Sequence, residues 1–219
     1  MYFLRIFLSI SLTAGLGFGG YAYWLMDEIK RQHAISTERA LFDIANILSS
    51  QLSSKVKNGI IDTSDFDGTF KNLKKLSFEA VIHDFVIKKS NINVFIADKN
   101  KVVLYDSRSK ENVGKPVNWR DVNLTLKGEY GARSTQENIN DEFSHVFYVG
   151  SPIWDKNRST YPPKIDNIIG VVSVSKSTES FKNFVFGGQD RIILMVVTLF
   201  IAALTLAVLF SYWLTRPIS

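Results

Sequence analysis

Cysteine is absent from this chain of 219 residues, and histidine is scarce, with three in all. Without cysteine the chain cannot form disulfides, thiolate zinc sites or a cysteine nucleophile. A folded domain that has no disulfide must rest on its own hydrophobic core. The 165 residues between two long apolar runs suffice for one such core.

The three histidines do not form a recognisable catalytic site. His83 and Asp84 match a dipeptide of metal phosphohydrolases, but the further histidines and aspartates of that site are missing. Ser144 and His145 are neighbours in a strand pattern, where successive side chains point to opposite faces and cannot form a nucleophile–base pair. We therefore expect no catalytic residue, no metal site and no cofactor within this chain.

Charge of one sign is not concentrated anywhere in the sequence. The net charge is +5, from 26 basic and 21 acidic residues. The basic residues are spread out, without the clusters and interleaved aromatics that a groove for nucleic-acid phosphates needs. Nucleic acid is therefore not an expected partner.

Two runs carry no charge at all: residues 6–26 and 192–214, which are 21 and 23 residues long. A helix rises about 1.5 Å per residue and the hydrocarbon layer is about 30 Å thick, so each run can cross a membrane. The alternative for the first run is a cleaved signal peptide, whose apolar region is usually only about 7–15 residues long. Charged residues follow Met26 where small residues would mark a cleavage site, which favours an uncleaved span.

The short flanks of the two runs indicate their orientation. Arg5 precedes the first run and Arg216 follows the second, and neither flank contains an acidic residue. By the positive-inside rule, residues 1–5 and 215–219 are expected in the cytoplasm, because short flanks rich in arginine stay there. Residues 27–191 then form one domain on the outer side.

The first run contains a cluster of glycines. Gly15, Gly17 and Gly20 match the spacing of the dinucleotide fingerprint, but that motif works after a strand and at the mouth of a helix, not inside lipid. Gly15 and Gly19 have the spacing of a small-xxx-small helix-packing face. A span that is merely rich in glycine remains an equal alternative.

Outside the membrane, apolar periodicity predicts a helix from residue 27 to about 57, and a shorter one over residues 64–76. Strands are predicted at residues 93–97, 102–105, 144–151 and 168–175, the first two joined as a hairpin by the polar turn 98–101. This order indicates an α+β domain in which helices cover one face of an antiparallel sheet.

The start of the second helix is rich in aspartate, which suggests a calcium loop. When Gly68 takes the sixth position of such a loop, Thr63 and Lys74 fall on the first and twelfth positions, which need acids. Helix capping and favourable first-turn charges explain these aspartates better.

Beyond these patterns, the sequence resembles the extracytoplasmic sensor region of CreC-type two-component histidine kinases. The resemblance covers most of residues 91–176 and lies in segments 93–98, 102–107, 113–114, 146–149, 152–153 and 169–176, and most densely in residues 119–135, WRDVNLTLKGEYGARST. It implies a PAS-like (PDC or Cache-type) antiparallel-sheet sensor domain with a long N-terminal helix, flanked by two transmembrane helices. The implied location is a bacterial inner membrane, with the sensor domain in the periplasm.

The resemblance also implies parts and partners beyond the residues given. Residues 215–219, which include Arg216 and Pro217, look like the start of a HAMP linker. A kinase part that uses ATP and Mg²⁺, a cognate response regulator, a homodimer and an unknown small-molecule or protein stimulus are then expected. Two alternatives stay open: the sensor of a chemoreceptor or cyclic-dinucleotide enzyme, and a membrane-anchored module that binds a protein partner.

Candidate ligand-binding residues follow from the same resemblance. Related dicarboxylate and citrate sensors carry a basic residue four positions before a strand proline, and here that place before Pro152 holds Tyr148. This departure speaks against a carboxylate ligand gripped at that place. The candidate residues are Trp119, Arg120, Tyr130, Arg133, His145, Tyr148 and Lys176. Core packing for Trp119 and a contact that holds a Gly131-Ala132 turn for Arg133 are the structural alternatives.

The connection between the last strand and the second span is the expected route of the signal. Residues 177–191 contain three phenylalanines and then Gly187 and Gly188. We expect a short amphipathic element with a hinge at the two glycines, because glycine has no side chain to restrict its backbone.

Overall fold

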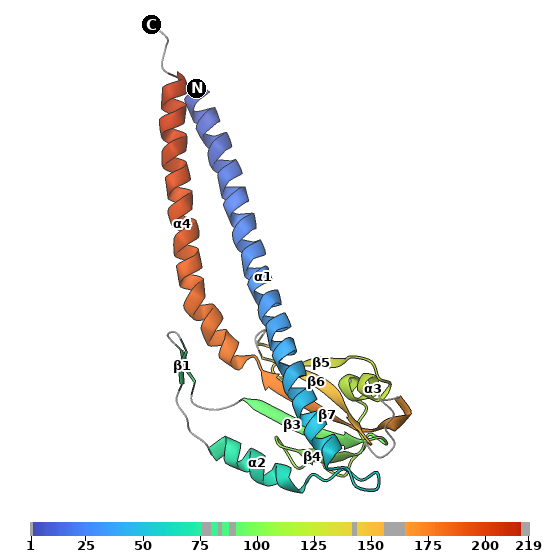
Figure 1. The fold of residues 1–219 in the computed structure, drawn as a ribbon. Helices are drawn as coiled ribbons and strands as arrows, with labels where there is room; N and C mark the ends of the chain where they lie inside the picture. The colour runs from blue at the N-terminus through green and yellow to red at the C-terminus, as the bar shows by residue number, and fades with distance from the viewer. Residues whose placement is uncertain are drawn as a thin grey trace. The chain divides into compact units, whose positions relative to one another are not determined.

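The computed structural model describes residues 2–75, 80–82, 85–87, 91–141, 144–155 and 165–215. The chain divides into two compact units. The helical-pair unit consists of Met1–Ala34 and Lys182–Ser219, and the sheet unit of Ile35–Phe181. Two long helices, α1 (Tyr2–Ser54) and α4 (Glu179–Thr215), contribute residues to both units (Figure 1).

In the helical-pair unit, α1 and α4 contact each other through apolar side chains. The rings of Phe18 and Phe200 meet edge to face, with their centroids 6.5 Å apart. A Cβ atom at Gly15 would lie 3.5 Å from the Phe200 ring, whereas one at Gly19 would meet nothing within 4 Å. Gly15 therefore packs against α4 of its own chain, and contact of Gly19 with a second copy stays a prediction.

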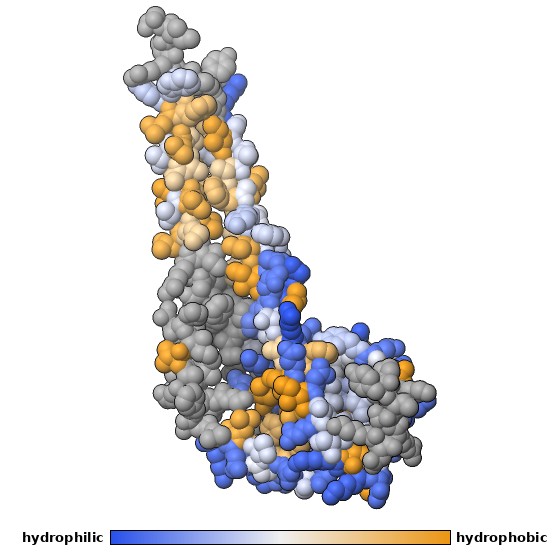
Figure 2. Space-filling model, viewed as in Figure 1, coloured by the Kyte–Doolittle hydropathy of each residue, from blue (hydrophilic) through white to orange (hydrophobic). Residues whose placement is uncertain are grey.

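Within the part of the chain that the structure describes, one helical segment, Ile193–Trp213, is long and apolar enough to cross a membrane. Large apolar side chains gather on the surface of this unit (Figure 2). Leu194 and Trp213, for example, are 67% and 69% exposed, which suits a lipid environment better than water. Residues 6–26 are helical as predicted, but their passage through a membrane stays a prediction.

The sheet unit is built on a five-stranded antiparallel sheet with the strand order β4-β3-β7-β6-β5. Its strands are β3 (Ile92–Asp98), β4 (Val103–Asp106), β5 (Gly131–Gln136), β6 (His145–Trp154) and β7 (Ile168–Ser177). A separate antiparallel pair joins β1 (Ala80–Ile82) to β2 (Phe85–Ile87), and a 3₁₀ turn (Ile165–Asn167) precedes β7. The α+β class and the four predicted strands are confirmed.

The turn between β3 and β4 shows why the hairpin was predictable. The Oδ1 atom of Asp98 accepts the backbone N–H groups of Asn100 and Val102, both at 2.8 Å. Lys101 takes the left-handed conformation, with φ at 66°. Aspartate and asparagine favour such turns because their short side chains bond to the nearby backbone.

One face of the sheet is covered by α1 and by α2 (Ser64–Lys75). Alternate residues of the strands point to this face and bury themselves against the helices. The buried members of this core are Leu41, Ala45, Leu52, Val56, Ile61, Phe66, Phe70, Val94, Ile96, Val149, Ile153, Val172 and Val174. The predicted long helix is confirmed and ends at Ser54, before Asn58 and Gly59 turn the chain with positive φ.

The aspartates around the start of α2 act as a cap and as first-turn charges, as predicted, and two of them also form ion pairs. The Oδ1 atom of Asp62 accepts the backbone N–H of Ser64 at 3.0 Å and its hydroxyl at 2.7 Å. These hydrogen bonds, first that of the hydroxyl, hold the pKa of Asp62 below its usual value. Asp65 pairs with Lys55, and Asp67 pairs with Lys71.

The opposite face of the sheet is covered by a short helix, α3 (Arg120–Leu126). Phe95, Ala97, Val122 and Val171 form a second buried cluster there. The prediction that helices lie on one face is therefore wrong. β3 and β7 carry apolar residues on both faces of the sheet, so both faces are covered by helices. The predicted turn at Gly131-Ala132 is also wrong, since these residues begin β5.

The connection from the sheet to the second apolar run is direct. Glu179 begins α4 two residues after β7 ends at Ser177. The helix runs on through Gly187 and Gly188, so the connecting element is helical, and a hinge at these glycines stays a prediction. Arg216 and Pro217 lie outside the described residues.

Candidate functional site

Three of the predicted ligand-binding residues meet on the α3 face of the sheet. Arg133 on β5 pairs directly with Tyr148 on β6, so their side chains emerge side by side on one face. The guanidinium carbon of Arg133 lies 3.7 Å from the centre of the Tyr148 ring and 5.0 Å from that of Trp119. Phe95 completes the aromatic group, with its ring centroid 4.8 Å from that of Trp119. The arrangement orients the Arg133 guanidinium by cation–π contacts.

These side chains line a pocket of about 250 Å³, which we call the Arg133 pocket. It opens between the sheet and the segment that leads from β4 to α3. The lining residues are Asn93, Val94, Phe95, Asp106, Arg108, Ser109, Asn112, Trp119, Arg133, Tyr148 and Ser175. A concave site with an aromatic wall and a few convergent polar groups is the usual form of a small-molecule site.

The carboxylate of Asp121, which contacts Arg133, is completely buried. Its Oδ1 atom accepts the Nε–H of Arg133 at 2.9 Å, and its Oδ2 atom accepts the hydroxyl of Ser173 at 2.7 Å. A buried carboxylate is tolerated only when its charge and its lone pairs are satisfied, and these two donors do both. Asp121 thereby links α3 to β5 and, through Ser173, to β7.

Two glycines let α3 lie close enough to the sheet for these bonds. A Cβ atom at Gly131 would overlap the Thr125 hydroxyl and the backbone carbonyl oxygen of Asp121. One at Gly150 would meet the same hydroxyl. Thr125 in turn donates its hydroxyl to the Asp121 carbonyl oxygen at 2.7 Å. Glycine is required at these positions for close packing, and not for backbone conformation.

A second arginine reaches the pocket from the segment after β4. Asp106 accepts the backbone N–H groups of Arg108 and Ser109, at 2.8 and 3.4 Å, and so fixes the start of this segment. The Arg108 guanidinium forms an ion pair with Glu137, and Arg108 lines the pocket together with Tyr148. The hydrogen bond to Glu137 is the main reason why the pKa of Arg108 lies above its usual value.

The other four predicted residues lie elsewhere. Arg120 is exposed on α3, and the Tyr130 ring packs beside Phe42 of α1, with centroids 6.2 Å apart. His145 and Lys176 alternate with Tyr148 and Ser175 along their strands, so they point to the α1 face. The sheet itself separates them from the Arg133 pocket. Burial, and then the charge of Glu38, raises the pKa of Tyr130.

Asp121, Ser173 and Arg108 were not predicted as site residues. Asp121 stands in the first turn of a helix, where an acid has an ordinary explanation in the helix dipole. Ser173 is one of three serines in a strand whose alternate positions carry valine. No local pattern separates these residues from solvent-facing ones, because their role depends on contacts between distant segments.

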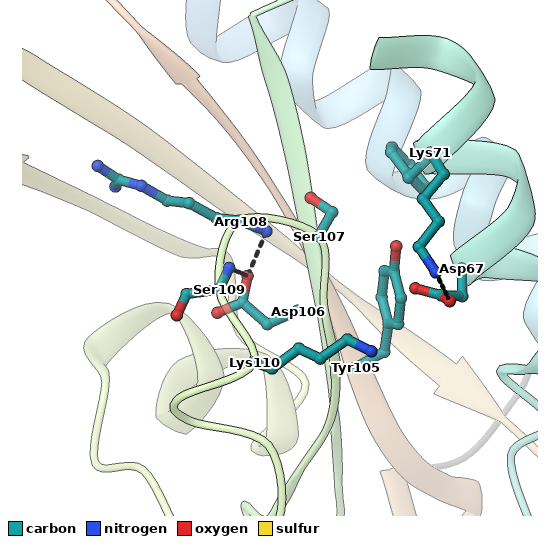
Figure 3. A pocket seen from close by; sticks show the side chains of 9 residues that line it. Asp67, Lys71, Tyr105, Asp106, Ser107, Arg108, Ser109 and Lys110 are labelled. Atoms are coloured by element: carbon teal, nitrogen blue, oxygen red, sulfur yellow. Dashed lines mark hydrogen bonds and ion pairs between the residues drawn. The ribbon is translucent and has the colours of Figure 1, made fainter. Parts of the chain in front are cut away.

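A neighbouring pocket of about 210 Å³ lies between α2 and the end of β4. Figure 3 shows Lys71 paired with Asp67 on one side and the Asp106 turn on the other, with the Arg108 side chain directed away from Lys71. The Tyr105 hydroxyl donates to the carbonyl oxygen of Phe66 at 3.2 Å, and burial is the main cause of its raised pKa. The charges that line this pocket are of both signs.

Among the described residues, no group of three or more histidine, aspartate and glutamate side chains is placed to hold a metal ion. The polar groups that line the Arg133 pocket are mainly guanidinium, amide and hydroxyl donors, with one carboxylate, that of Asp106. The geometry therefore suits recognition of a small molecule by hydrogen bonds.

The chain is 31% identical over 217 residues to the sensor protein CreC of Escherichia coli strain K12. The match covers 99% of this chain and 44% of that protein. The resemblance to a CreC-type sensor region is confirmed. Because the chain spans less than half the length of this relative, the similarity supports a sensor module, and the activity of the whole protein is a proposal.

Two other comparisons add little. No protein-family model matches the sequence. The comparison with solved structures matches the crystal structure of a C-terminal domain from Streptococcus mutans, with a TM-score of 0.30, 9% identity, and coverage of 49% of this chain and 98% of that chain. A TM-score this low supports no conclusion about the chain.

Proposed function

We propose that this chain is the membrane-bound sensor module of a two-component histidine kinase. It detects a stimulus outside the cytoplasm and passes the signal to a cytoplasmic kinase part. The observation that carries the proposal is the 31% identity to the CreC sensor protein, which extends over 99% of this chain. That match includes both the helical-pair unit and the sheet unit.

In this proposal, the sheet unit is a PAS-like (PDC or Cache-type) sensor domain in the periplasm. A five-stranded antiparallel sheet with a long N-terminal helix on one face supports the assignment. Residues 6–26 and Ile193–Trp213 are the two spans of the inner membrane, with both termini in the cytoplasm. Arg5 and Arg216 support this orientation by the positive-inside rule.

The signal leaves the sheet unit through β7. Thr178, which follows this strand, is hydrogen-bonded to β6. Its backbone N–H and its hydroxyl both donate to the His145 carbonyl oxygen, at 2.8 and 2.9 Å. The His145 N–H in turn donates to the Thr178 hydroxyl oxygen at 3.2 Å. One residue later α4 begins, so a shift of β7 acts on the helix without an intervening loop.

Further parts and partners follow from the proposal. A HAMP linker begins at residues 215–219, and the cytoplasmic part holds the phosphoacceptor histidine and binds ATP with Mg²⁺. The protein is a homodimer that phosphorylates a cognate response regulator. The stimulus is a small molecule or a protein that acts on the sheet unit.

Two measurements test this function. Codons that follow Ser219 are expected to encode an acceptor histidine and the glycine motifs of an ATP-binding domain; a long heptad array or a cyclic-dinucleotide domain in their place would contradict the kinase. In bacteria, a reporter that is active only in the cytoplasm should work after Ser219 and fail at Asn157. A reporter that is active only in the periplasm should show the reverse, and the opposite result would overturn the two-span topology.

A further inference from the structure

We propose that the Arg133 pocket binds a small anion, held by the guanidinium groups of Arg133 and Arg108. The inference rests on the proposed sensor function and names the class of ligand that the sensor takes. A carboxylate or a phosphate group supplies the shared chemistry, because both present paired oxygens that match the fork of a guanidinium.

Arg133 is fixed in a position that leaves most of its donors for a ligand. A guanidinium has five N–H donors, and in Arg133 the Nε–H donates to Asp121. The plane of the group is held by the rings of Tyr148 and Trp119. Within the described ranges, no protein acceptor is seen for the four N–H groups on its two Nη atoms. The Asp121 contact therefore holds one edge of the group, and the other edge serves the pocket.

Arg108 contributes a second guanidinium around the same tyrosine. It lines the same pocket as Tyr148, while Arg133 lies over the ring of that residue. The Arg108 and Glu137 side chains are 52% and 39% exposed, and exposed ion pairs are weak. A ligand anion can therefore take the place of Glu137 on Arg108 at little cost.

The remaining lining favours an anion over a cation. Asp106 is the one carboxylate among the lining residues, and its Oδ1 atom already accepts two backbone N–H groups. The side-chain amides of Asn93 and Asn112 and the hydroxyl of Ser109 can donate. A cation would also have to compete with Arg133, which already occupies the faces of the aromatic rings. The volume of about 250 Å³ is below the range for drug-sized ligands, so the anion is small.

Tyr148 supports the guanidinium of Arg133. It offers its ring as a platform for Arg133, which is its direct partner on the neighbouring strand. This contact is invisible in the sequence, where the two residues are 15 positions apart.

The test uses the whole chain in lipid nanodiscs and follows thermal unfolding by tryptophan fluorescence. The probes are sodium citrate, sodium succinate and sodium phosphate, each compared with sodium chloride at the same ionic strength and with neutral succinamide. A ligand that binds the folded state raises Tm in a saturable way. We expect at least one of the three anions to do so and succinamide to have no effect; the set separates a carboxylate ligand from a phosphate ligand.

Two variants and one control locate the site. Arg133→Lys keeps the charge but loses the fork, and Arg108→Gln removes the exposed guanidinium; each should weaken the apparent Kd at least about tenfold, as loss of a charge-assisted hydrogen bond does. Arg120→Gln removes an exposed arginine outside the pocket and should leave the Kd unchanged. If Arg133→Lys does not fold, Arg108→Gln decides. Three results would overturn the anion site: no specific stabilisation by any of the anions, equal stabilisation by succinamide, or an unchanged Kd in the pocket variants. The sensor function is tested separately, by the topology reporters and by the codons that follow Ser219.

Discussion

The buried pair of Asp121 and Arg133 predicts a marked asymmetry between its two single variants. Arg133→Gln leaves a carboxylate that is completely buried and without its counter-charge. Breaking a buried pair in this way costs about 3–5 kcal/mol of the free energy of unfolding. Asp121→Asn leaves a guanidinium whose side chain is still 16% exposed and can reach water, and its amide oxygen can still accept one hydrogen bond. The loss should then be about 2 kcal/mol, the contribution of a charged hydrogen bond.

Matched variants separate this effect from loss of an arginine in general. Arg108→Gln breaks an ion pair in which both partners, Arg108 and Glu137, are exposed. It should therefore lower the free energy of unfolding by only about 0–1 kcal/mol. The double variant of Asp121→Asn and Arg133→Gln removes both charges together. It should be more stable than the sum of the two single losses predicts, because neither charge is left alone.

The assay is native-state hydrogen exchange of the full chain in nanodiscs, read on the amides of β3 and β7. These strands pair with each other in the middle of the sheet, so they exchange by the largest opening of the sheet unit. Two results would contradict the claim that the buried Asp121 carboxylate needs Arg133 as its counter-charge. One is an equal loss of exchange protection in Arg133→Gln and Arg108→Gln; the other is a larger loss of stability in Asp121→Asn than in Arg133→Gln.

Two further predictions concern packing and assembly. Gly131→Ala should destabilise the sheet unit by about 1–3 kcal/mol, because the added Cβ would overlap Thr125 and the Asp121 backbone. As a control, Gly68→Ala should be close to neutral or slightly stabilising, because a Cβ there would meet nothing within 4 Å. Equal Tm values for the two variants would contradict the close packing of α3 against the sheet. Single cysteines placed at residues 29–50 should crosslink two copies with a period near 3.5 residues along one stripe of α1, as in a helical dimer, and uniform or absent crosslinking would count against that interface.

The sequence was most informative where structure depends on neighbouring residues. The β3–β4 hairpin follows from two apolar runs around Asp98 and Asn100, and the strands and helices on the α1 face follow from simple periodicity. These features need no knowledge of distant parts of the chain. The same holds for the capping of α2 by Asp62, which lies two residues before its partner Ser64.

The sequence was least informative where distant segments meet. Arg133 and Tyr148 were both expected near a ligand, but their stacking depends on the β5–β6 register. His145 and Lys176 were expected there too, and the alternation of the strands directs them to the other face. Gly131 is ambiguous by itself: glycine suggests a turn, and here it gives α3 room to approach a strand. Asp121 carries no local sign that it is buried.

The most direct test of the account asks whether this chain controls a kinase. The matching part of the E. coli CreC sensor protein is replaced by this chain, and phosphorylation of the chimera by labelled ATP is measured in membrane vesicles. A second chimera carries four Gly-Ser residues inserted after Gly188, within α4. Because only a difference in free energy between two states of the connection can pass a signal, the insertion should change the level of phosphorylation while the sheet unit stays folded. We expect an active chimera whose phosphorylation shifts with the insertion. A chimera that is not phosphorylated, or one that the insertion leaves unchanged, would contradict transmission from the sheet through α4.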